Sequence, residues 1–94
     1  MSNRTAPALA KLDELLAALE QQPRTPELAT LIDDTHALRR AVAAFHMEAI
    51  RFRMYSVDRD LQAAGEAPEP RRLYDELRQA LEAAGFHTRS HSAP

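Results

Sequence analysis

The chain has 94 residues, a length that suits one domain with a modest core. It contains no cysteine, which excludes disulfides, thiolate zinc sites and a cysteine nucleophile. Its formal net charge of −2 at pH 7 does not indicate a strongly charged partner. Alanine (18) and leucine (12) dominate, whereas valine and isoleucine together number only four, so the composition predicts an all-α fold. We expect a single helical domain over residues 1–94, frayed at 1–5 and disordered in a tail at 87–94.

The first helix is predicted over about residues 7–21. Pro7 suits a first helical turn, and leucines then recur at spacings of three and four residues, which is the pattern of an amphipathic helix. Pro23 ends this helix, and the short connector after it can reverse the chain. The leucines of the stripe are Leu9, Leu12, Leu15, Leu16 and Leu19.

The second helix is predicted to be unusually long, over about residues 26–64. Thr25 is placed to cap it and Pro26 fits its first position. No proline or glycine then interrupts the chain before Gly65, which provides a left-handed stop. We therefore expect one continuous central helix, roughly 58 Å long at 1.5 Å per residue. Helix propensity is weakest at residues 55–57.

The third helix is predicted over about residues 70–84. Leu73, Leu77 and Leu81 form one stripe, and Gly85 ends the helix. Phe86 is then placed to fold back on the last turn in a Schellman-type contact. Three helices, with the long one at the centre, are the predicted architecture.

The long helix carries more apolar surface than two short flanking helices can cover. One stripe keeps coiled-coil heptad spacing and a second lies beside it, so we expect a helical-bundle homodimer in which two long helices pack together. Small alanines in the middle of the helix would allow a close, antiparallel crossing. The expected interface residues are Leu38, Val42, Phe45, Ala49, Phe52, Ile50 and Met54.

The sequence leaves open both the oligomeric state and the role of one polar row. The chain could instead be a monomeric three-helix bundle with the long helix kinked near residue 55. A polar row runs along the helix at steps of seven residues and consists of Arg39, His46, Arg53 and Asp60. In a dimer this row could pair with Glu48 or Asp34 of the partner and fix the register; the alternative is that it faces solvent.

A metal site is a second hypothesis. Asp33 and His36 are three residues apart and share a helical face, a spacing that metal-binding bundles use, and His46 and Glu48 lie farther along the same helix. These four residues are the candidate metal ligands, and completing a site would require both subunits. The alternative is a surface histidine hydrogen-bonded to a local aspartate. We otherwise expect no cofactor.

Nucleic-acid binding is a third hypothesis. Arg51, Arg53 and Arg59 are interleaved with Phe52 and Tyr55, a basic and aromatic mixture that can bind nucleic acid. Acidic residues interrupt this mixture, however, whereas phosphate binding requires unopposed cations, so nucleic acid is not the partner we expect.

The leading functional hypothesis is a small assembly or adaptor protein that acts by homodimerisation and by protein contacts of the long helix. No catalytic arrangement stands out, and the glycine-rich loops of nucleotide-binding enzymes are missing, so we do not expect an enzyme. No stretch has the roughly 20 apolar residues that span a membrane. We expect a soluble, cytoplasmic protein that contacts a second copy of itself and can contact a further protein, but no membrane.

Overall fold

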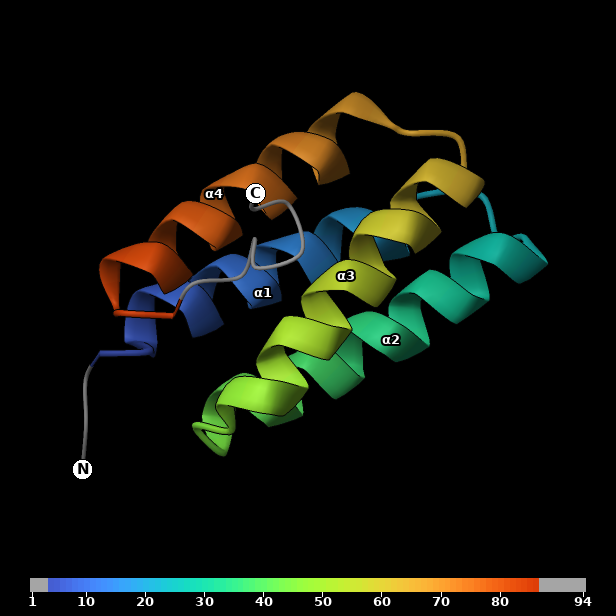
Figure 1. The fold of residues 1–94 in the computed structure, drawn as a ribbon. Coiled ribbons are helices and arrows are strands. Elements are labelled where there is room, and N and C mark those ends of the chain that lie inside the picture. The colour runs from blue at the N-terminus through green and yellow to red at the C-terminus, as the bar shows by residue number, and fades with distance from the viewer. Residues whose placement is uncertain (1–3, 87–94) are drawn as a thin grey trace, which may run out of the picture.

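The computed structural model describes residues 4–86 as an all-helical bundle (Figure 1). No strand occurs within this described range, so the predicted all-α class is confirmed. The predicted first and third helices are found within one or two residues of their expected bounds, and the predicted tail at 87–94 lies outside the described residues. The helices are α1 (Ala6–Glu20), α2 (Pro26–Ala43), α3 (Met47–Ala63) and α4 (Pro68–Ala83).

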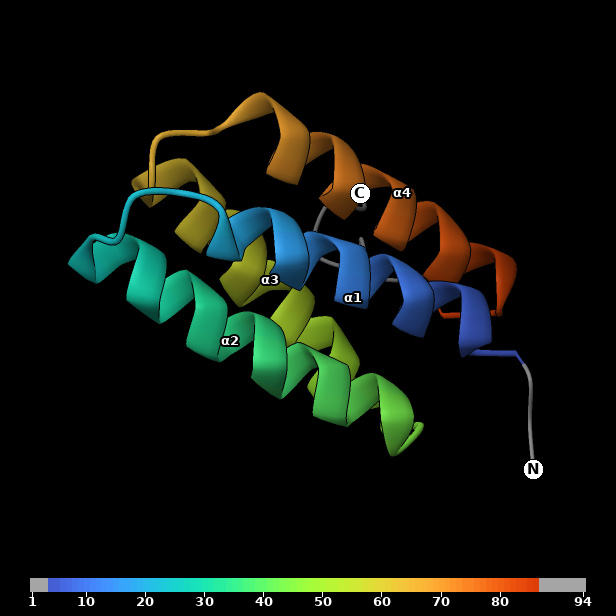
Figure 2. The same cartoon turned by 180° about the vertical axis from the view of Figure 1, so that it is seen from behind.

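Successive helices run in opposite directions. The α1–α2 and α3–α4 connectors therefore lie at one end of the bundle, and the α2–α3 connector lies at the other (Figures 1 and 2). The helices pack most closely as the pairs α2–α3 and α1–α4, whereas α3 and α4 contact each other only loosely. A buried hydrogen bond of 2.9 Å, from the Tyr74 hydroxyl to the Met54 carbonyl, nevertheless ties α4 to α3.

The prediction of one continuous helix over residues 26–64 is wrong. The helix ends at Ala43, and α3 begins at Met47 after a reversal of the chain. Phe45 adopts a left-handed conformation with φ of 61°, which a non-glycine residue rarely does. The amides of Phe45 and His46 donate to the carbonyls of Val42 and Ala41, the hydrogen bonds of a Schellman helix end. The chain thus makes a glycine-type stop without glycine.

Local contacts compensate for the strain of this reversal, which is of the order of 1–2 kcal/mol. His46 caps α3, because its Nδ1 accepts a hydrogen bond of 3.1 Å from the Ala49 amide. The Phe45 ring meets the Phe86 ring edge to face, with 5.0 Å between centroids. The break lies at residues 44–46 and not near residue 55, where sequence propensity is weakest.

Folding back allows one chain to bury most of the apolar surface that seemed to require a partner. Residues from both stripes of the 28–61 segment enter a single core together with α1 and α4. The apolar excess on which the dimer prediction depended is therefore largely covered within the monomer. The buried residues of these two stripes include Leu28, Leu31, Ile32, Leu38, Val42, Ile50, Met54, Val57 and Leu61.

The remaining helix ends follow the sequence signals. The Thr25 hydroxyl accepts a hydrogen bond of 3.1 Å from the Leu28 amide, as predicted for the cap of α2. Gly65 and Gly85 have φ of 103° and 99° and terminate α3 and α4. The Phe86 amide donates to the Leu81 carbonyl, and its ring is buried, which confirms the predicted Schellman-type contact.

Candidate functional site

The outer face of α3 is the main place where aromatic residues remain exposed in the described structure. Phe52 is 60% exposed and Tyr55 is 49% exposed, and they lie three residues apart, one turn along the helix. Glu48 and Arg59 continue the same row at spacings of four residues and are also exposed. We call these four residues the outer face of α3. The opposite side of the helix enters the core.

Two arginines cover the aromatic rings of this face. The Arg53 guanidinium carbon lies 5.3 Å from the centroid of Phe52, and that of Arg59 lies 5.6 Å from the centroid of Tyr55. Glu48 and Arg59 form no ion pair with any described residue. The face therefore combines two exposed rings with one charge of each sign, and neither charge belongs to an ion pair in the described structure.

The four residues of this face are arranged symmetrically along the helix, with the two aromatic residues at the centre and the two opposite charges at the ends. Phe52 and Tyr55 are equidistant from the midpoint between Arg53 and Met54, and so are Glu48 and Arg59. A second identical helix laid antiparallel about that midpoint would place aromatic against aromatic and acid against base at every position of the row. The outer face of α3 is therefore complementary to itself.

A pair of carboxyl groups lies between α2 and α3, beside this face. Asp60 is buried, and its Oδ2 has no hydrogen-bond partner among the described residues. Burial, followed by the hydrogen bond and negative charge of Asp34, raises the pKa of Asp60 to about 7, against an opposing effect of Arg59. Arg53 approaches the other carboxylate, with 3.9 Å between its Nη1 and Asp34 Oδ1. Asp60 is thus a buried carboxyl beside a second acidic side chain.

The predicted interface residues separate into two groups. Leu38, Val42, Ile50 and Met54 are fully buried inside the monomer, and Ala49 packs against the core. Phe45 and Phe52 are exposed, but Phe45 lies in the α2–α3 connector and Phe52 on the outer face of α3. Of the predicted set, only these two side chains offer a large apolar surface to a second molecule.

The predicted polar row meets its partners within one chain. Arg39 pairs with Asp13 of α1, with 2.7 Å between Nε and Oδ1, and Arg53 approaches Asp34 of α2. His46 caps α3. Of the pairings that the sequence placed across a dimer seam, the described structure contains one within the chain, between Arg53 of α3 and Asp34 of α2.

The candidate metal ligands do not form a cluster in the structure. Asp33, His36 and Glu48 are exposed, and the Nδ1 of His46 is occupied by the Ala49 amide. Within residues 4–86 there is no group of three or more histidine, aspartate or glutamate side chains that could hold a metal ion. These positions therefore give no support to a metal centre within one chain.

Two of the three candidate nucleic-acid residues are engaged locally. Arg53 and Arg59 lie over aromatic rings of their own helix, and Arg51 has a buried Nε that lacks a partner among the described residues. They do not build a basic face, because Glu48, Asp58 and Asp60 lie on the same helix. None of the described helices is long and apolar enough to cross a bilayer.

Comparison with known proteins adds no family to this description. No protein-family model matches the sequence, and neither a curated protein nor a solved structure is detectably similar to it.

Proposed function

We propose that this protein is a small assembly module that forms a two-fold dimer through the outer face of α3. The single observation that carries the proposal is the self-complementary order of Glu48, Phe52, Tyr55 and Arg59 on an exposed helical face. In the dimer, Phe52 packs on Tyr55 of the second copy, and Glu48 pairs with Arg59 of the second copy. The two-fold axis makes each contact twice.

The proposed seam differs from the one expected from sequence. A seam through the middle of α2 would have to expose core residues such as Leu38 and Val42, which are fully buried. A seam on α3 leaves the monomer fold intact and covers rings that are already exposed. The antiparallel orientation is kept from the sequence hypothesis, but its centre moves to the midpoint between Arg53 and Met54.

The small contact area limits the stability that we expect of the dimer. Two helices that touch along one row bury less than the roughly 1,200 Å² that stable specific interfaces need. We therefore expect a reversible dimer with a dissociation constant in the micromolar range or weaker. A protein of this kind acts by bringing copies together, and a further protein partner could add to the same face. The cytoplasmic location expected from the sequence stays a prediction.

Substitution of Phe52 by aspartate tests the proposal. Phe52→Asp places a charge at the centre of the seam and is expected to keep the protein monomeric at all concentrations, because a buried unpaired carboxylate opposes association. Sedimentation equilibrium from about 20 µM to about 1 mM covers the expected range of dissociation constants. Gln79→Asp, at an exposed position on α4, is the matched control and should dimerise as the parent does. Dimerisation of the Phe52→Asp variant with unchanged affinity, at unchanged helical circular dichroism, would contradict the proposal.

A further inference from the structure

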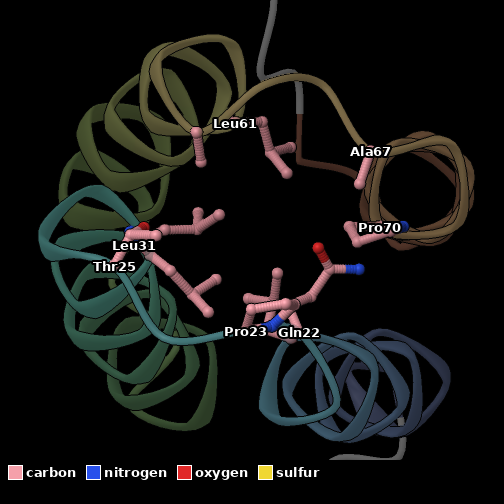
Figure 3. Close-up of a pocket in the computed structure, with 10 residues that line it drawn as sticks. Gln22, Pro23, Thr25, Leu31, Leu61, Ala67 and Pro70 are labelled. Atoms are coloured by element: carbon pink, nitrogen blue, oxygen red, sulfur yellow. The ribbon is translucent and has the colours of Figure 1, made fainter.

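A cavity of about 220 Å³ opens at the end of the bundle where the α1–α2 and α3–α4 connectors meet (Figure 3). All four helices contribute to it, and Figure 3, which looks along the bundle, shows their ends surrounding the space. Small-molecule sites in proteins are concave and are lined mostly by apolar side chains with a few polar groups. An open cavity of this kind is therefore a candidate binding site. Its apolar lining comes from Leu19, Pro23, Leu28, Leu31, Leu61, Ala64, Ala67 and Pro70.

The polar side chains of the lining are few and uncharged. Gln22 and Thr25 supply them, and the Thr25 hydroxyl is already engaged as the cap of α2. Gln22 extends its amide from the α1–α2 connector into the space, toward Ala67 and Pro70 (Figure 3). That amide makes no hydrogen bond with any described residue. The cavity thus presents an apolar wall and one amide that can orient a guest.

We propose that this cavity binds a neutral amphipathic small molecule, whose apolar body fills the leucine-lined space and whose single polar group hydrogen-bonds the Gln22 amide. An apolar cavity of about 150 Å³ accepts benzene, so this volume suits a guest of about nine non-hydrogen atoms. A charged guest is disfavoured, because no ionised side chain lines the cavity to replace its hydration. This inference is independent of the dimer, whose seam lies on the outer side of α3.

Indole and indene are matched probes for this proposal, because they have the same size and only indole carries an N–H group. Titration of each into ¹⁵N-labelled protein, followed by amide shifts, locates the binding site. We expect saturable shifts for residues of the lining such as Leu28 and Ala64, with indole binding about tenfold tighter than indene. Gln22→Leu should remove this preference, because the leucine cannot hydrogen-bond the indole N–H.

Filling the cavity gives the second arm of the test. Ala64→Leu, or Ala67→Leu if the first variant folds poorly, should abolish indole binding while thermal stability is kept or raised. Ala43→Leu, at an exposed position at the far end of α2, is the control and should bind as the parent does. The proposal is overturned if indole gives no saturable shifts up to millimolar concentration, or if its binding survives when the cavity is filled.

Discussion

Replacing Asp60 by asparagine is expected to stabilise the protein in a strongly pH-dependent way. Burial and Asp34 hold the pKa of Asp60 at about 7 in the folded protein, so Asp60 stays protonated there below about pH 7. In the unfolded chain Asp60 has an ordinary aspartate pKa and loses its proton from about pH 4 upward. The unfolding free energy therefore falls as the pH rises from about 4 to about 7 and then stays level. Asparagine resembles the protonated side chain and does not titrate.

The expected gain from Asp60→Asn is near zero at about pH 3.5, grows up to about pH 7 and reaches about 2–4 kcal/mol above it. Urea unfolding at several pH values across this range measures it directly. Asp33→Asn removes an exposed carboxylate one residue from Asp34 and should change stability little at any pH. A gain that does not depend on pH, or a loss at pH 8, would show that Asp60 is not held protonated by its surroundings.

Reversing the two charges of the outer face of α3 separately is expected to weaken dimerisation in each variant, and mixing the variants should restore it. In Glu48→Arg, the new arginine faces Arg59 of the other copy at both ends of the seam. In Arg59→Glu, the new glutamate faces Glu48 of the other copy at both ends. Like charges at both ends should weaken the dimer about tenfold or more. The two variants complement each other, because every contact in the mixed dimer joins an acid to a base.

The mixing experiment separates the proposed register from other modes of association. Native mass spectrometry distinguishes the mixed dimer from a homodimer of either variant, because the two substitutions change the mass of a copy in opposite directions. Circular dichroism verifies that each variant folds. Glu27→Arg, an exposed charge reversal on α2, serves as the control and should leave dimerisation unchanged. If the single variants dimerise as the parent does, or if the mixture remains monomeric, Glu48 and Arg59 do not face each other across a seam.

The helix ends that the sequence predicted correctly carry a local chemical signal. Thr25 followed by Pro26 marks a start, and Gly65 and Gly85 mark stops whose left-handed geometry glycine adopts freely. The break at residues 44–46 carries no such signal, since its left-handed residue is Phe45. Tertiary packing decides this turn: folding back buries α3 against α2, and this gain exceeds the local cost. Propensity alone therefore favoured one long helix.

The same distinction holds for the candidate site. The sequence placed Phe52 in a dimer interface and both Phe52 and Tyr55 among arginines, and in the structure both rings are exposed and lie close to arginines. It assigned Glu48 to a metal site and Arg59 to nucleic acid. Their symmetric placement about the exposed rings depends on which side of α3 the other helices bury, and the sequence alone does not determine that side. The Asp34–Asp60 pair and the cavity beside Gln22 depend on contacts between helices, which no periodicity reveals.

A distance between two spin labels tests the antiparallel α3 dimer most directly. The chain has no cysteine, so Gln62→Cys provides a single thiol for a nitroxide at an exposed position near the end of α3. In the proposed dimer the two labels lie on opposite sides of the axis, and pulsed dipolar spectroscopy should give about 25–35 Å at 1.5 Å per residue. A separation of about 10–15 Å, as in a parallel pairing, or no dipolar coupling at a concentration where dimers are expected, would contradict the account.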